Sequence, residues 1–106
     1  MKRNMVIVEI SNRTEPLIEQ LTQIWERSVK ATHLFLSDDE IADIKKFVPD
    51  TLSQVAHLVI AINETGDPIG FMGIEDCKIE MLFISPEERG KGVGKAFIEY
   101  GVPYRK

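Results

Sequence analysis

The sequence has little cysteine, since Cys77 is the only one among 106 residues. A single thiol excludes an intramolecular disulfide and a zinc site built from several thiolates, and it is typical of a reducing cytoplasm. Long apolar runs are also missing: residues 58–62 and 81–84 fall far short of the roughly 20 residues that a membrane helix needs. Polar residues interrupt the N-terminal apolar stretch, so it shows no signal-peptide pattern. We therefore expect a cytoplasmic protein with no membrane partner.

An excess of positive charge is absent as well, because the net charge is −4. This value argues against a chain-wide attraction to nucleic acid. The charge is nevertheless unevenly distributed: residues 85–106 carry +2, whereas residues 1–84 carry −6. We expect a bound anion to favour the C-terminal part of the chain.

The length and composition predict one globular domain over residues 1–106, with 43% hydrophobic and 28% charged residues. A β-rich run at 5–10 precedes a helical pattern that begins after residues 12–14, and a capping box at 37–40 starts a second helix that Pro49 interrupts. A strand buried on both faces is predicted at 58–62, because its apolar run is continuous. Further strands are predicted at 68–75 and 78–84, joined by a turn at 76–77, and a last helix begins at Gly92 or Val93. The predicted class is α/β in the order β-α-α-β-β-β-α.

Side-chain alternation assigns faces within the strand at 78–84. Ile79, Met81 and Phe83 are expected on one face, and Glu80, Leu82 and Ile84 on the other. Trp25 belongs to the apolar stripe of the first helix, so we interpret it first as a core residue and second as a substrate contact.

The segment most informative about function is Arg89-Gly90-Lys91-Gly92-Val93-Gly94-Lys95, between a strand and a helix. Glycines allow positive φ angles and close approach of a ligand, and a helix N-terminus presents free N–H groups at the positive end of its dipole. These features predict an anion site in which backbone amides set the geometry and Arg89 and Lys91 add charge. A tight turn without a ligand is the alternative.

Two common phosphate-binding motifs do not fit. A P-loop requires a glycine where Arg89 stands and a hydroxyl where Ala96 stands. The dinucleotide fingerprint G-x-G-x-x-G fails because Lys95 stands where its third glycine would be. The segment also opens the last helix of the chain, whereas the fingerprint belongs to a βαβ unit near the start of a domain. A nucleotide-binding regulator is therefore disfavoured.

Arg89-Gly90-Lys91-Gly92-Val93-Gly94 spells the motif [QR]-x-x-G-x-[GA] of the GNAT superfamily of acetyl-CoA-dependent N-acetyltransferases, and residues 80–86 resemble the strand and proline turn before it. The order of elements resembles the first half of that fold, a mostly antiparallel sheet flanked by helices. Residues 25–36 resemble the helix-one-to-two region of small bacterial members.

The resemblance implies acetyl transfer from acetyl-CoA to a primary amine of a small molecule or protein, with no metal. The loop from Arg89 to Lys95 would bind the CoA pyrophosphate, and Leu82, Phe83 and Ile84 would bind pantetheine. Glu80 would act as the base or anchor the substrate; a solvated or ion-paired strand residue is the alternative. Trp25 and His33 would meet the acceptor, although His33 also fits a loop residue that caps backbone groups.

The resemblance covers the N-terminal two-thirds of the family's domain and ends after the CoA-binding helix. We therefore expect an incomplete GNAT domain with weak or absent acetyl transfer. A strand at 78–84 without a downstream neighbour would expose its edge, which favours a homodimer. A non-catalytic acyl-CoA-binding or dimerising module is the alternative function.

Overall fold

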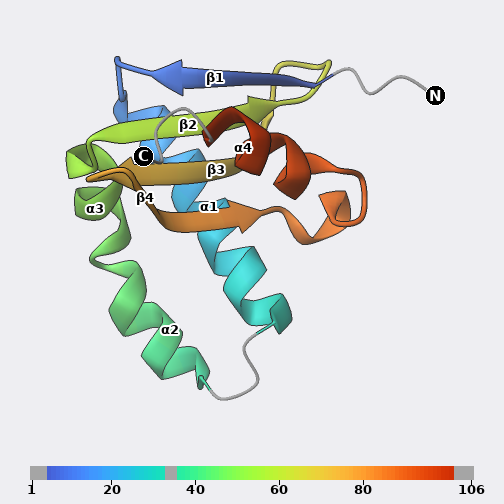
Figure 1. Ribbon diagram of the computed structural model, residues 1–106. Helices are drawn as coiled ribbons and strands as arrows, with labels where there is room; N and C mark the ends of the chain where they lie inside the picture. The colour runs from blue at the N-terminus through green and yellow to red at the C-terminus, as the bar shows by residue number, and fades with distance from the viewer. Residues whose placement is uncertain (1–4, 33–35, 102–106) are drawn as a thin grey trace.

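The computed structural model describes residues 5–32 and 36–101, and its centre is an antiparallel sheet in the order β1-β2-β3-β4 (Figure 1). The predicted fold class is confirmed. The strands are β1 (Val6–Ile10), β2 (His57–Ile62), β3 (Pro68–Glu75) and β4 (Lys78–Ile84). The helices are α1 (Glu15–Thr32), α2 (Asp38–Lys45), α3 (Val48–Gln54), the short 3-10 helix η1 (Pro86–Glu88) and α4 (Val93–Gly101).

Helices cover both faces of the sheet: α1, α2 and α3 lie on one face and α4 on the other (Figure 1). The strand β2 contributes to both cores, since Leu58 and Ile60 pack toward α1 while Val59 and Ala61 pack toward α4. The prediction that this strand is buried on both faces is confirmed. Within the described residues, no helix combines the length and the apolar composition needed to cross a bilayer.

The capping box at the start of α2 is confirmed. The backbone N–H of Glu40 donates to Ser37 Oγ at 3.1 Å, and the N–H of Ser37 donates to Glu40 Oε1 at 2.8 Å. Pro49 has a different effect from the one expected, because it lies in the first turn of a separate helix, α3. A proline there needs no N–H, and its fixed φ suits a helix start. The described residues therefore form one α-helix more than predicted.

Arg13 joins the start of α1 to the end of α3. Its guanidinium contacts backbone carbonyls that α3 and the following residues leave without helical donors. The distances are 3.0, 3.1 and 2.6 Å from Nη1 to Leu52, Ser53 and Val55, 3.3 Å from Nη2 to Ala56, and 3.5 Å from Nε to Ile10. One cation thus fixes two segments that lie some 40 residues apart in the chain.

Candidate functional site

The glycine-rich segment follows η1 and continues into the first turn of α4, so a short 3-10 helix separates it from the strand that was expected to precede it directly. Gly90 and Gly92 have φ angles of 79° and 86°, which L side chains rarely adopt. The N–H of Ala96 donates to the Gly92 carbonyl at 3.0 Å, which is the first hydrogen bond of α4. The preceding amides of the first turn have no intrahelical acceptor and stand at the positive end of the helix dipole. The backbone therefore provides the donor geometry of an anion site.

Two basic side chains of the loop, Arg89 and Lys91, already have protein partners. Arg89 Nη2 donates to Ser28 Oγ at 3.1 Å and approaches the Ser28 carbonyl at 3.4 Å, so its guanidinium is directed toward α1. The Lys91 ammonium lies 3.6 Å from Glu88. For binding an anion, the backbone amides are therefore better placed than the guanidinium of Arg89.

A second hydrogen bond joins the same two segments. Arg27 Nη2, from the last part of α1, donates to Ser85 Oγ at 3.2 Å. Both serines are buried, whereas the residues Arg27 and Arg89 are exposed. The reciprocal contacts hold the end of α1 against the loop that precedes α4.

The strand β4 leads into this loop and contains a β-bulge. Met81 pairs with Gly73, but Ile79 pairs with Ile74, so Glu80 is an extra residue in β4. The expected alternation is therefore wrong for Ile79, which packs on the α4 face, whereas Met81 and Phe83 pack on the α1 face. A bulge shifts the two-residue period by one position, which periodicity alone does not reveal.

The remaining predicted residues of β4 keep the expected faces. Leu82 and Ile84 pack toward α4, and Phe83 packs toward α1. Among the described residues β4 pairs with β3 only, so it is an edge strand of this sheet. Glu80 is exposed at the bulge. Along the chain, this edge strand leads through η1 into the glycine loop.

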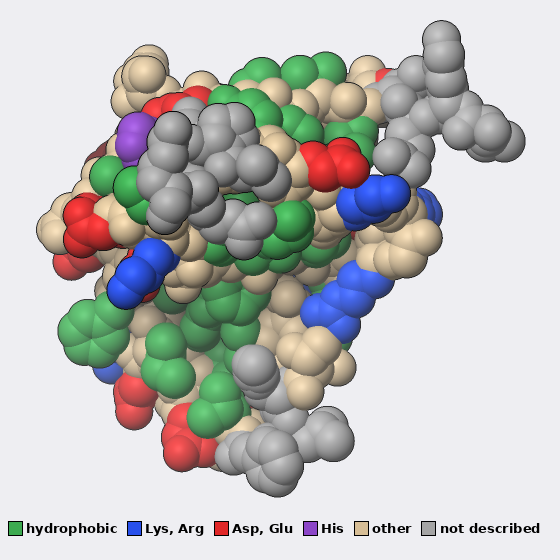
Figure 2. Space-filling model, in the orientation of Figure 1, with side chains coloured by type: hydrophobic (Ala, Val, Ile, Leu, Met, Phe, Trp, Pro, Cys, Tyr) green, Lys and Arg blue, Asp and Glu red, His purple; other side chains and the backbone are tan. Residues whose placement is uncertain are grey.

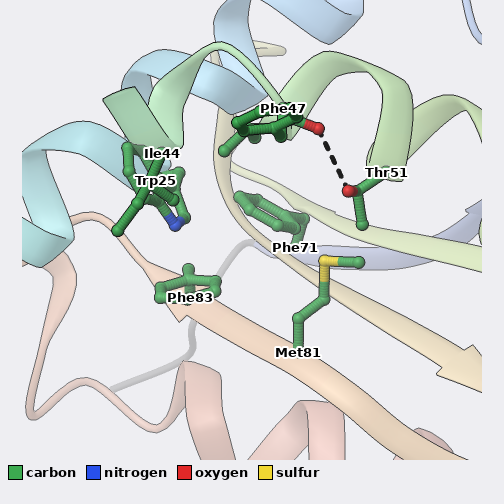
Figure 3. A pocket seen from close by; sticks show the side chains of 8 residues that line it. Trp25, Ile44, Phe47, Thr51, Phe71, Met81 and Phe83 are labelled. Carbon is green, nitrogen blue, oxygen red and sulfur yellow. Dashed lines mark hydrogen bonds between the residues drawn. The ribbon is translucent and has the colours of Figure 1, made fainter. Parts of the chain in front are cut away.

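An apolar pocket of about 180 Å³ opens between the helices of the α1 face and β4 (Figure 3). Hydrophobic side chains gather between β4 and α2 on the face shown in Figure 2. Trp25 is buried at 7% exposure and still lines the pocket, whereas Ile44 and Phe47 are 42% and 68% exposed. The complete lining is Trp25, Ile44, Phe47, Val48, Thr51, Phe71, Met81 and Phe83.

The structure brings two of the predicted site residues together, because Trp25 and Phe83 both line this pocket. Glu80 precedes Met81 of the lining but does not line the pocket itself. His33 lies outside the described residues. Phe47 lines the pocket but was not predicted as a site residue; its high exposure identifies it in the structure, and the exposure of a side chain cannot be read from the sequence.

One carboxylate behind the pocket has a clear electrostatic environment. Glu26 of α1 accepts a hydrogen bond from Lys45 of α2 at 2.8 Å, and Lys30 lies 3.2 Å away. These two ammonium groups, with Lys45 contributing most, lower the pKa of Glu26 from its usual value near 4.5. The pair fixes α2 against α1 and so helps to position the pocket wall. No group of three or more His, Cys, Asp or Glu side chains placed to bind a metal occurs within the described ranges.

Comparison with known proteins identifies a family match over most of the chain. A model described as the acetyltransferase (GNAT) family matches residues 18–104. A curated relative, the peptidyl-lysine N-acetyltransferase YjaB of Salmonella typhimurium, is 40% identical over 84 residues, which are 79% of this chain and 57% of the relative. The chain therefore spans a little over half the length of that protein.

Solved structures agree with this match. The solution structure of apo-form YjaB from Escherichia coli superimposes with a TM-score of 0.82 at 35% identity, covering 95% of this chain and 66% of the other. A GNAT family acetyltransferase from Brucella melitensis, solved in complex with acetyl-CoA, has a TM-score of 0.66 at 13% identity. The superposition covers 96% of this chain and 68% of the Brucella melitensis chain. At 13% identity, the similarity shows the fold alone.

Proposed function

The chain belongs to the acetyltransferase (GNAT) family, and from this premise we propose that it transfers the acetyl group of acetyl-CoA to a primary amine. The observation that carries the proposal is the pair of positive-φ glycines, Gly90 and Gly92, immediately before the first turn of α4. The first amides of α4 have no intrahelical acceptor and stand at the positive end of the helix dipole, and the pyrophosphate of CoA supplies the complementary negative charge.

The residues of the loop fit such a ligand. A Cβ on Gly90 would meet no atom within 4 Å, so glycine is required there by its φ angle and not by crowding from the protein. A Cβ on Gly94 would lie 3.4 Å from Ile84 Cδ1, so the first turn of α4 packs closely on the end of β4. The exposed Lys91 and Lys95 add positive charge near the amides. We assign pyrophosphate binding to the loop from Arg89 to Lys95.

The edge of β4 extends from this loop toward the pocket. We propose that backbone groups of Leu82, Phe83 and Ile84 hydrogen-bond the pantetheine chain, in the manner of an added strand. An N–H of Leu82 or Phe83 would also stabilise the negative charge that develops on the acetyl oxygen. Acetyl-CoA, when bound, supplies a thioester that a neutral amine can attack.

A primary amine is protonated at neutral pH, so the site needs a group that removes a proton. Glu80 is the carboxylate of β4, and the bulge places it in an exposed position close to the proposed acetyl site in sequence. We propose that Glu80 accepts the amine proton, directly or through water, or holds the ammonium before transfer. Replacement of Glu80 by Gln should then lower turnover without weakening CoA binding.

The proposed acceptor is the ε-amine of a lysine in a peptide or protein. The name of the curated relative, a peptidyl-lysine N-acetyltransferase, supports this choice. The exposed apolar surface beside β4 supports it too, because a peptide can cover such a surface while it presents its lysine. The single exposed cysteine fits a cytoplasmic site of action.

Isothermal calorimetry with acetyl-CoA, ATP and NAD tests the cofactor. We expect acetyl-CoA alone to bind, and Gly92→Val to weaken it more than tenfold because a side chain opposes the positive φ and occupies ligand space. Gly66→Val is the matched control: Gly66 has a φ of 88° in the β2–β3 turn, so it suffers similar backbone strain away from the loop. Equal CoA affinity in both folded variants would contradict the assignment.

A thiol-release assay with acetyl-CoA and a panel of amines tests the reaction. We expect at most weak CoA release with lysine peptides, and a further loss of at least tenfold in Glu80→Gln. Turnover that is unchanged in Glu80→Gln would contradict the role of Glu80. Binding of acetyl-CoA without turnover on any amine would favour the non-catalytic acyl-CoA-binding module instead.

A further inference from the structure

We propose that the apolar pocket between α1, the α2–α3 pair and β4 binds a large apolar side chain of the acceptor, next to the lysine that is acetylated. This inference rests on the proposed function, since it assigns the specificity of the same site. It predicts that the acceptor is selected by a leucine, methionine or phenylalanine beside the reactive lysine.

The pocket is continuous with the proposed acetyl site. Phe83 belongs to the β4 segment assigned to pantetheine, and its ring also lines the pocket together with Met81 (Figure 3). The ring of Phe71 on β3 lies against that of Phe83, with centroids 5.6 Å apart, and forms the floor. A residue next to the reacting lysine can therefore reach the pocket while the amine remains at the strand.

The chemistry of the lining selects an apolar group. Thr51 carries the only hydroxyl of the lining, and that hydroxyl donates to the Phe47 carbonyl at 3.0 Å. No carboxylate lines the pocket. A carboxylate that entered would lose its water and meet the negative faces of aromatic rings, whereas an apolar side chain would leave water favourably. The rings offer an ammonium only cation–π contacts, and the reacting amine must be neutral, so we expect it at the strand and not in the pocket.

The size of the pocket and the exposure of its rim support the same occupant. A volume of about 180 Å³ is comparable with the roughly 150 Å³ apolar cavity that accepts benzene in another protein. Phe47 and Ile44 are two of the four large hydrophobic residues that the described chain exposes, and both lie at this pocket. Exposed apolar side chains gathered around a cavity are typical of an interaction site.

The sole tryptophan of the sequence gives a direct readout, because Trp25 lines the pocket. Short lysine peptides with Leu, Ala or Asp on either side of the lysine are titrated while Trp25 fluorescence is followed. We expect the Leu peptide to change the emission and to bind at least tenfold more tightly than the Asp peptide. The acetylation rate should show the same preference in kcat/KM.

Phe47→Asp tests the pocket itself. Phe47 is 68% exposed, so the variant should remain folded. The matched control is Ile98→Asp on α4, a 40% exposed apolar residue away from the pocket. We expect only Phe47→Asp to abolish the preference for the Leu peptide, with acetyl-CoA affinity unchanged in both variants.

The outcomes separate this inference from the proposed function. Equal binding of the Leu and Asp peptides, or a preference for Leu that survives Phe47→Asp, would overturn the pocket assignment even if acetyl-CoA binds and reacts. Failure of acetyl-CoA to bind would overturn the proposed function, while the Trp25 titration would still report whether an apolar side chain enters the pocket. An emission change that depends on protein concentration and not on peptide would indicate a second copy as the occupant and would also overturn the inference.

Discussion

Arg13 and Arg89 each join segments that are distant in sequence, but the two regions are held in different ways. Arg13 meets five backbone carbonyls, which belong to the end of β1 and to the end of α3 and the residues after it. Arg89 meets one serine of α1, and Arg27 returns a single bond to Ser85. The region around Arg13 is fixed by many contacts, whereas the region of the proposed site is held by few. Of these two arginines, the one with more hydrogen bonds thus lies away from the proposed site.

The largest expected effect is therefore at Arg13. Replacement of Arg13 by Ala removes a charged donor from several carbonyls and should lower the free energy of unfolding by about 2–3 kcal/mol. For a domain of this size the melting temperature should fall by roughly 10 °C or more. Arg27→Ala is the control and should change stability by less than about 1 kcal/mol. Similar losses in both variants, measured by urea unfolding, would remove the contrast between the two regions.

The open edge of β4 gives the next prediction. No described strand pairs with this edge, so when no acetyl-CoA is bound its N–H and C=O groups should pair with a second chain, and we expect the ligand-free protein to be a dimer in light scattering at micromolar concentration. The variant Phe47→Asp should still dimerise if the strand edge, and not the pocket, forms the contact. A monomer whose melting does not depend on protein concentration would contradict this prediction.

A smaller effect is expected where Arg89 meets Ser28. If Arg89 acts by positioning the loop, Arg89→Ala should weaken acetyl-CoA binding by roughly threefold to tenfold, the equivalent of about 1 kcal/mol. Ser28→Ala should weaken binding no more than that, because the contact to the Ser28 carbonyl remains, and the double variant should be no weaker than Arg89→Ala. A loss in Arg89→Ala alone, with a reduced dependence on salt, would instead show direct contact with the pyrophosphate.

The smallest effect concerns the pair of Glu26 and Lys45. Because the folded pKa of Glu26 is lowered, the pair stabilises the fold above the usual pKa near 4.5, and this contribution is lost as the pH falls through the folded pKa. Lys45→Gln should cost about 0.5 kcal/mol at pH 7 and less as the pH falls below 4.5. The control Lys46→Gln alters a more exposed pair, 3.6 Å from Asp43, and should change stability by less. A loss in Lys45→Gln that does not vary with pH would contradict the assignment.

Local features of the fold were predictable from the sequence. The capping box of α2, the glycine loop and the doubly buried β2 depend on residues a few positions apart, and the structure confirms each. The positive φ angles of Asp76 and Cys77, at 52° and 64°, likewise fit the predicted tight turn between β3 and β4.

Features that depend on contacts between distant segments were not predictable. Nothing near Arg13 indicates that its guanidinium meets carbonyls about 40 residues later. The pocket required α2 and α3 to separate at Lys46 and Phe47 and to meet β4, which no periodicity encodes. The roles of Glu80 and of the loop residues remain predictions, because they concern groups that only a bound ligand would reveal.

The bulge in β4 has a consequence for how Glu80 can be interpreted. The pairs on either side of it, Ile79 with Ile74 and Met81 with Gly73, would form an uninterrupted ladder if Glu80 were deleted. Each apolar side chain would keep its present face, so the sheet has no structural requirement for this residue. The pairing of β4 with β3 therefore does not need Glu80. A deletion variant that folds normally would show that this residue is present for a reason other than folding.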